Sequence, residues 1–540
     1  MKNLFLSLIV LFVFSCKNDK NEVDAIIINA NVYTVDANFN RTEAFAIKDG
    51  KFVATGSTKD IQQHYSATEV IDAKGQTIVP GLIDAHCHFY NLGLNFQTVD
   101  LVGTSSFDEV MKRIIAFQNE KQPKFIIGRG WDQNDWQDKT YPNKALLGEL
   151  YPDLPVALTR IDGHAMLCNQ AALDLANITI DTNVFGGEIK TEKGKLTGIL
   201  IDNPMELVEA IFPEPTKKQQ IEALLDAQKF CTNLGLTTVS DAGLDRQVIE
   251  LIDSLQKANT LQMRVYAMIS NKKENLDYYL NKGKIKTEKL NVQSVKVYAD
   301  GALGSRGAAL KQPYSDEHNH FGAMVIGAED YKNLALRIDK AGYQMNTHAI
   351  GDSANRFVLK TYEKTLANQT NRRWRVEHAQ VITDNDFDYF KSENIIPSIQ
   401  PTHATSDMYW AEDRVGTDRI KGAYAYKTLL DKSGRVALGT DFPVEQVNPF
   451  LTFYAAVARK DLKGFPEQGF QKENGLSRVE ALKGMTIWAA YSNFEDQEKG
   501  SIEIGKYADF IILNQDIMDV EEEKIPLTKV QETYINGVAQ

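Results

Sequence analysis

The stretch "GLIDAHCH", residues 81–88, is an apolar run that ends in two histidines one residue apart. Short apolar runs of this length are typical of buried strands in a parallel sheet. Side chains i and i+2 of a strand point to the same side, so His86 and His88 can meet one ligand while Cys87 faces the other way as a buried thiol. Alone, the pair is either half of a metal site or two neighbouring ring side chains.

Seven more apolar runs follow this one, and a helix-length stretch comes after each. They cover residues 236–243, 264–270, 294–301, 343–352, 374–380, 395–403 and 435–443. Eight strand-then-helix units predict an α/β fold, a (β/α)8 TIM-like barrel over residues 80–495. No Gly-x-Gly-x-x-Gly fingerprint follows the first strand, which disfavours an open dinucleotide-binding sheet.

The stretch between the first two barrel strands, about residues 90–225, is too long for a single crossover connection. We expect an inserted subdomain there, with strands of its own near 124–132 and 155–167. Outside the barrel, strand-like runs occur at 25–36, 43–56 and 68–80, and again at 500–514 and 530–540, with tight-turn pairs at Asp49-Gly50 and Asn536-Gly537. These predict a small β-sandwich domain formed by both termini, residues 21–79 and 496–540.

Residues 1–20 have the pattern of an export signal and tether. Lys2 precedes an eleven-residue apolar core from Leu4 to Phe14, too short for a stable bilayer span, and Cys16 follows it. The segment resembles a bacterial lipoprotein signal with Cys16 as the lipidated residue. It predicts an exported lipoprotein, anchored in the periplasm or at the outer membrane, whose only membrane contact is this anchor. An ordinary cleaved secretory signal and an uncleaved anchor are the alternatives.

Composition narrows the class of partner. The net charge of −12 over 540 residues, without a run of Lys and Arg, argues against nucleic-acid binding and favours a small-molecule substrate. Three cysteines besides Cys16 give an odd number without zinc-finger spacing, so no disulfide framework is expected. Oligomeric state is not predicted.

Residues that can bind a metal occur at or near the ends of five of the eight predicted strands. They are His86, His88, Lys296, His348, His378 and Asp441. The carboxyl ends of barrel strands meet on one face, and imidazoles with a carboxylate suit Zn²⁺ or a similar divalent ion. The ammonium form of Lys296 would repel metals, so we expect a neutral lysine that reacts with CO₂ to give a bridging carbamate. Alternatively, Lys296 reaches solvent or pairs with Asp300.

The motifs "PGLIDAHCH", "VKVYADG", "NTHAIGD", "VEHAQ" and "LGTDFP" together resemble the amidohydrolase superfamily, specifically the amidohydrolase-3 branch that includes N-substituted formamide deformylase. The resemblance covers residues 24–540. It implies two Zn²⁺ ions: His86, His88 and Asp441 on the first, His348 and His378 on the second, and carboxylated Lys296 between them.

A site of this kind predicts a metal-dependent amidohydrolase that attacks the C–N bond of a small amide, such as an N-formyl amide, with a metal-bridging hydroxide. Asp441 is the expected catalytic proton shuttle, first as base and then as acid. The alternatives are a lactone or ester hydrolase on the same site, a mononuclear site, and a non-catalytic lipoprotein that binds a small molecule.

Five further residues are candidates for substrate binding. They are His164, Trp131, Asp132, His403 and Arg306. The first three lie just past apolar strands of the insertion, His403 lies at the end of the seventh barrel strand, and Arg306 could bind an anionic group. For each, a purely structural role is the alternative.

Overall fold

A computed structural model describes residues 20–540 of the chain. The predicted signal and its lipidation residue Cys16 lie outside the described residues. Within residues 20–540, no helix combines the length and hydropathy that crossing a bilayer requires.

Eight parallel strands form the centre of the molecule, in the order β22-β21-β20-β19-β18-β16-β15-β8. Their bounds are β8 (Leu82–Cys87), β15 (Leu236–Leu244), β16 (Arg264–Ser270), β18 (Leu290–Tyr298), β19 (Gln344–Ala349), β20 (Trp374–His378), β21 (Ile395–Ile399) and β22 (Ala437–Leu438). The segment after β22 returns to β8, where the Asp441 backbone N–H donates to the His86 carbonyl at 2.8 Å. This contact nearly closes the sheet, and the predicted (β/α)8 barrel is confirmed.

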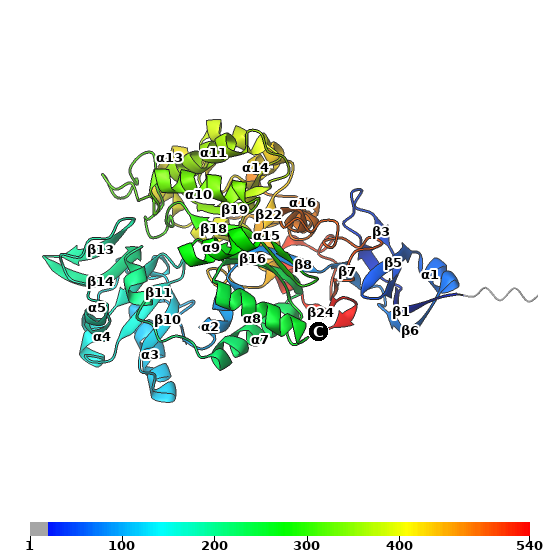
Figure 1. The fold of residues 1–540 in the computed structure, drawn as a ribbon, viewed down its shortest axis with the longest axis horizontal. Coiled ribbons are helices and arrows are strands. Elements are labelled where there is room, and N and C mark those ends of the chain that lie inside the picture. Colours follow the sequence, from blue (N-terminus) through cyan, green and yellow to red (C-terminus); the bar gives the residue numbers. More distant parts are fainter. Residues whose placement is uncertain (1–19) are drawn as a thin grey trace, which may run out of the picture.

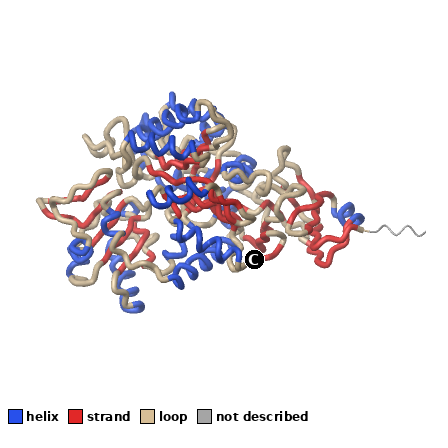
Figure 2. The backbone as a smooth tube through the Cα atoms, in the orientation of Figure 1, coloured by secondary structure: helices blue, strands red, loops and turns tan. Residues whose placement is uncertain are grey.

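Helices surround the strands, as Figure 2 shows. They are α7 (Lys217–Asn233), α8 (Arg246–Lys257), α9 (Lys273–Lys282), α10 (Ala328–Lys340), α11 (Asp352–Leu366), α14 (Tyr426–Ser433), α15 (Pro449–Ala458), α16 (Arg478–Gly484) and α17 (Ile487–Ser492). Between β20 and β21 the chain forms a 3-10 helix, η2 (Asp384–Lys391), and α12 (Pro401–Asp407) and α13 (Ala411–Arg419) follow β21. Apolar side chains of the strands and of these helices form one large buried core.

A separate sheet lies between β8 and β15 in the sequence, with the order β13-β14-β12-β11-β10-β9. Its strands are β9 (Val99–Asp100), β10 (Ile126–Trp131), β11 (Val156–Arg160), β12 (Ala165–Cys168), β13 (Gly187–Glu192) and β14 (Lys195–Asp202). Its helices are α3 (Phe107–Lys121), α4 (Ala145–Leu150), α5 (Gln170–Leu175) and α6 (Met205–Glu209), with η1 (Gln133–Asp135). Figure 1 shows this sheet, in cyan, beside the barrel. At the two ends of the predicted 90–225 stretch, α2 (Phe89–Asn95) and α7 pack with the barrel core instead.

A β-bulge interrupts β10 at Gly130. Opposite β11, the register moves from Arg129–Thr159 to Trp131–Arg160, so two residues of β10 pass one residue of β11. Gly130 has φ +115°, and a Cβ there would lie 2.6 Å from a Val102 methyl group. The bulge reverses the side-chain alternation beyond it, so Arg129 and Trp131 point to opposite faces of the sheet.

Both ends of the described chain contribute strands outside the barrel. One sheet has the order β5-β4-β1-β6 and the other the order β25-β24-β23-β7-β2-β3. The strands are β1 (Asn21–Ile28), β2 (Asn31–Tyr33), β3 (Arg41–Thr42), β4 (Ala44–Lys48), β5 (Lys51–Gly56), β6 (Tyr65–Asp72), β7 (Thr77–Pro80), β23 (Phe510–Leu513), β24 (Val530–Ile535) and β25 (Val538–Ala539), with helix α1 (Thr58–His64). Apolar residues of both sheets share one buried cluster. The division into a separate sandwich domain stays a prediction.

Candidate metal centre

Two histidines and an aspartate meet where the end of β8 faces the segment after β22. His86 lies in β8, and His88 is the residue that precedes α2. The Nε2 atoms of His86 and His88 lie 3.5 and 3.3 Å from the same oxygen, Asp441 Oδ1. That oxygen is buried and has no hydrogen-bond partner within residues 20–540. A buried carboxylate oxygen without a partner, faced by two imidazole nitrogens, is a donor set that fits a divalent metal ion.

The other predicted ligands complete this cluster. Lys296 Nζ lies 2.9 Å from His86 Nε2. The ring of His378 is 5.0 Å from that of His86 and 4.5 Å from that of His348. The fold therefore brings together all six residues that the sequence predicts as metal ligands. Their role as metal ligands stays a prediction.

Burial sets the protonation states that these groups favour. Burial is the main cause that lowers the pKa of His348 and of His378 well below the ordinary histidine value, and it lowers the pKa of Lys296 to about 8. Burial opposes the charge of Asp441, but the neighbouring histidines, His86 first, keep its pKa well below the usual range. Neutral imidazoles and an ionised carboxylate are the ligand forms that metals require. A lysine whose pKa is this low also has a larger neutral fraction near neutral pH than an ordinary lysine.

Two residues of the cluster have left-handed backbone conformations. The φ angle is 72° at His378 and 64° at Asp441. Such angles cost about 1–3 kcal/mol per residue outside glycine, and they occur mainly where the surrounding structure fixes a functional side chain. His378 ends β20 and Asp441 lies in the segment after β22, so both left-handed residues occur where the chain leaves a strand.

A second layer of buried polar groups orients the histidines. Glu377 Oε2 accepts a hydrogen bond from His86 Nδ1 at 2.6 Å, and the other oxygen lies 2.7 Å from Arg375 Nε. Gln400 Oε1 is 2.7 Å from His378 Nδ1. With Nδ1 bonded in this way, the Nε2 atoms of His86 and His378 are left for a ligand.

The alternative roles of Lys296 do not fit the structure. Its side chain is buried, with 1% of the residue exposed, so it does not reach solvent. Asp300, the alternative partner, accepts backbone N–H groups from Ala309, Ile350 and Gly351 instead. Lys296 therefore faces His86 and the ring of Tyr298, 4.8 Å away, rather than a neutralising carboxylate.

One of the substrate-binding candidates in the insertion reaches the cluster. The ring of His164 lies 5.0 Å from the ring of His348. Its Nδ1 atom is 2.7 Å from Asp202 Oδ1, in an ion pair of which both members belong to the insertion. Asp202 leaves Nε2 as the nitrogen free for a substrate. His164 is thus in position to contact a molecule bound at the cluster.

His403 also lies at the cluster, but it belongs to the first turn of α12 rather than to the end of β21. Its ring stacks on that of His378 at 5.8 Å, and Nε2 lies 3.8 Å from Asp441 Oδ2. His378, His403 and Asp441 form a second group of ligand-type side chains whose donor atoms lie within 4.8 Å of one another.

The other three candidates have structural contacts. Trp131 is buried in the core of the insertion, and its indole N–H donates to the Leu158 carbonyl at 2.7 Å. Asp132 forms an ion pair with buried Arg160. Arg306 pairs with Asp316 at 2.9 Å. The bulge at Gly130 turns the indole of Trp131 into the core of the insertion. The predicted contact of Trp131 with the substrate is therefore wrong.

Sequence reasoning missed several polar groups of the site. Glu377 immediately precedes a predicted ligand, and alternation along β8 would have placed Asp84 on the same side as His86. Asp84 does face inward: it accepts the Thr440 hydroxyl at 2.7 Å, which ties β8 to the segment after β22. Asp202 had no local signal, because its partner His164 lies 38 residues earlier in the chain.

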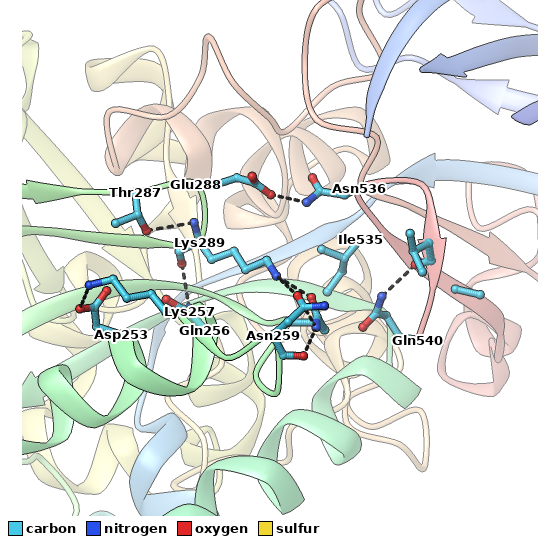
Figure 3. Close-up of a pocket in the computed structure, with 13 residues that line it drawn as sticks. Asp253, Gln256, Lys257, Asn259, Thr287, Glu288, Lys289, Ile535, Asn536 and Gln540 are labelled. Carbon is cyan, nitrogen blue, oxygen red and sulfur yellow. Dashed lines mark hydrogen bonds and ion pairs between the residues drawn. The ribbon is translucent and has the colours of Figure 1, made fainter. Parts of the chain in front are cut away.

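A surface pocket of about 680 Å³ lies elsewhere and is drawn in Figure 3. It is lined by polar side chains such as Lys257 and Lys289 and by the chain end at Gln540. These residues lie next to the amino-terminal ends of β16 and β18, whereas catalytic groups of such barrels lie at the carboxyl ends of the strands. The pocket is therefore separate from the histidine cluster.

The model of the amidohydrolase family matches residues 69–539, which include the whole barrel, the insertion and the histidine cluster. The chain belongs to the amidohydrolase family. The family match supports a hydrolase, a similar solved structure is that of a metal-dependent hydrolase, and the ligand types of the cluster support a site for a divalent ion. The predicted family is confirmed.

The similarity between this amidohydrolase and its relatives extends over nearly the whole chain. N-substituted formamide deformylase of Arthrobacter pascens is 27% identical over 542 residues, covering 95% of this chain and 98% of the relative. Protein LONG AFTER FAR-RED 3 of Arabidopsis thaliana is 33% identical over 533 residues, covering 95% and 91%. The crystal structure of an uncharacterized metal-dependent hydrolase from Pyrococcus horikoshii OT3 superposes with a TM-score of 0.75 and 28% identity, covering 92% and 99%.

Proposed function

We propose that this amidohydrolase hydrolyses the C–N bond of a small amide, with N-formyl and other N-acyl amines as the first substrates to test. The observation that carries the proposal is Asp441. Its Oδ1 is buried without a hydrogen-bond partner among residues 20–540 and lies 3.5 and 3.3 Å from the Nε2 atoms of His86 and His88, which is the arrangement expected of a carboxylate that shares a metal with them.

The proposed ligand assignment uses two divalent ions, with Zn²⁺ as the expected metal. His86, His88 and Asp441 would hold one ion, and His348 and His378 would hold the other. Lys296, as a carbamate formed with CO₂, would supply oxygen ligands shared by the two ions. This assignment is supported by the burial of Lys296, by its pKa of about 8, and by the 2.9 Å distance from Nζ to His86 Nε2.

When bound, divalent ions at this site would acidify a water molecule and polarise the carbonyl of the substrate. Asp441 then accepts the proton of the attacking water at Oδ2, the oxygen that faces His378 and His403 rather than His86 and His88. It returns the proton to the leaving nitrogen, because an amine leaves readily only after protonation. Glu377 keeps the ring of His86 in place, and His164 contacts the bound substrate through Nε2.

Purified protein with a measured metal content should be assayed against N-formyl and N-acyl amines, ureas, cyclic imides and esters. We expect turnover of at least one amide class. Asp441→Asn should reduce hydrolysis of amides far more than hydrolysis of activated esters, whose leaving groups need no proton. Absence of turnover across the whole panel by metal-loaded protein would contradict the proposal and favour a binding function.

A further inference from the structure

Arg129 differs from the other arginines of the insertion and of the loops that face it. Buried Arg160 contacts both Asp132 and Asp162. Arg306 and Arg414 share Asp316. Within residues 20–540, Arg129 has no ion-pair partner, and its side chain donates one hydrogen bond, from Nη2 to the Ile161 carbonyl at 2.8 Å.

The side chain of Arg129 is only partly exposed. Its Nε atom is buried and has no hydrogen-bond partner among the described residues. Burial lowers the pKa of Arg129, and the more distant carboxylates of Asp162 and Asp441 offset this only in part. A partly buried guanidinium with most of its five N–H donors unused has room for a further hydrogen-bonding partner from a ligand.

The position of Arg129 directs it toward the histidine cluster. Its side chain lies on the face of β10 opposite the core that holds Trp131, because the bulge at Gly130 moves Trp131 to the other face. Its Nη1 atom would lie 3.3 Å from a Cβ on Gly163, so the absent side chain at that position leaves room for the guanidinium. Gly163 immediately precedes His164, whose ring is 5.0 Å from His348. The guanidinium therefore lies against the residue that precedes His164, the residue of the insertion whose ring approaches His348.

We propose that Arg129 binds a carboxylate of the substrate, so that the enzyme acts on amides bearing a free carboxylate, such as N-formyl or N-acyl amino acids. This inference rests on the proposed function. A guanidinium presents parallel N–H donors that match a planar carboxylate. In the reaction, water adds OH to the acyl carbon and H to the nitrogen as the C–N bond breaks, and the products are a carboxylic acid and an amino acid.

The test compares N-formylphenylalanine with N-formylphenylalaninamide, which differ in charge and hardly in size. We expect the parent enzyme to prefer the acid by about 100-fold in kcat/KM, the scale of one buried charge-assisted contact. Arg129→Met should remove this preference, mainly through a higher KM for the acid, and leave the amide within about threefold. Arg129→Lys should keep part of it. Arg306→Met is the matched control, because Arg306 already has its carboxylate, and it should keep the full preference.

A second measurement does not depend on turnover. 3-Phenylpropionate and 2-phenylethylphosphonate are titrated calorimetrically into metal-free protein, with folding of each variant checked by circular dichroism. Binding of the carboxylate that disappears in Arg129→Met and persists in Arg306→Met supports the subsite, even if no amide is hydrolysed and the proposed function fails. Turnover of both substrates with no dependence on Arg129 overturns the subsite while the hydrolase proposal stands. Binding of the phosphonate alone overturns the carboxylate assignment.

Discussion

Replacing Glu377 with glutamine tests how the metal centre is supported. The carboxylate uses one oxygen to accept from His86 Nδ1 at 2.6 Å and the other to face Arg375 Nε at 2.7 Å, and both side chains are fully buried. Glutamine has a single acceptor oxygen. Its NH₂ group must therefore face either the Nδ1–H of His86 or the guanidinium of Arg375, donor against donor.

The substitution should lower both the stability of the protein and its affinity for metal. Breaking a buried ion pair costs about 3–5 kcal/mol, and the retained acceptor favours the lower end. For a chain of 540 residues, an unfolding entropy of about 2.1 cal/mol/K per residue gives roughly 1.1 kcal/mol/K, so about 3 kcal/mol lowers Tm by about 3 °C. Loss of the group that orients a metal-binding histidine weakens metal binding about 10- to 100-fold.

The assay measures Tm of the metal-free protein by calorimetry and the zinc affinity by competition with a chelating dye. Glu495→Gln is the matched control, because Glu495 is a buried glutamate paired with Lys499 at 2.7 Å and Lys286 at 2.5 Å, away from the histidines. It should lower Tm similarly and leave the zinc affinity unchanged. If Glu377→Gln binds zinc as tightly as the parent protein, the proposed support of His86 by Glu377 is wrong.

Four further outcomes are expected. Lys296→Ala should bind fewer than two metal ions per chain and lose the carbamate signal that ¹³C-bicarbonate gives in the parent spectrum; two ions with normal turnover would exclude the bridge. Asp202→Asn should lower kcat/KM about tenfold, the scale of one charge-assisted hydrogen bond, without loss of metal, and should add nothing to His164→Ala; additive effects would separate the two residues. Burial disfavours the Glu495 carboxylate, yet its lysine neighbours lower its pKa to about 2, so its contribution is present above about pH 4.5 and is lost as the pH falls toward 2. Between pH 5 and 3, Glu495→Gln should therefore lose less unfolding free energy than the parent, and equal losses would contradict this. Cys16→Ser should move the protein from the membrane fraction to the soluble fraction of expressing bacteria, and an unchanged distribution would argue against lipidation.

Much of the barrel and of the cluster was accessible from the sequence, because both rest on local patterns. A buried parallel strand needs a continuous apolar run, and the residue at its carboxyl end faces the shared pocket. An apolar run that ends in His86, His348 or Asp441 therefore predicts both a barrel strand and a residue of the site. Lys296 and His86 are 210 residues apart, yet each could be placed in the cluster from the strand to which it belongs.

The remainder depended on features that residue types do not reveal. Regular alternation would place Arg129 and Trp131 on the same face of β10, but the bulge at Gly130 moves Trp131 to the other face and into the core, which the residue types do not reveal. His403 entered a helix one turn beyond its strand, which changes the direction of its ring. The ion pairs that neutralise Asp132 and Arg306 form between segments that only the folded chain brings together.

The strand that leads into the metal centre is held by the far end of the chain. β7 runs through Gly81 into β8, and it pairs on one side with β23 at residues 510–513. Next to that strand, Asp509 bonds to buried Arg264 of β16 at 2.6 Å. More than 400 residues separate β7 from β23 in the sequence, so the partner of β7 is synthesised long after β7 itself. A polypeptide that ends before residue 510 lacks the strand that pairs with β7 on this side, and β7 leads directly into the strand that carries His86.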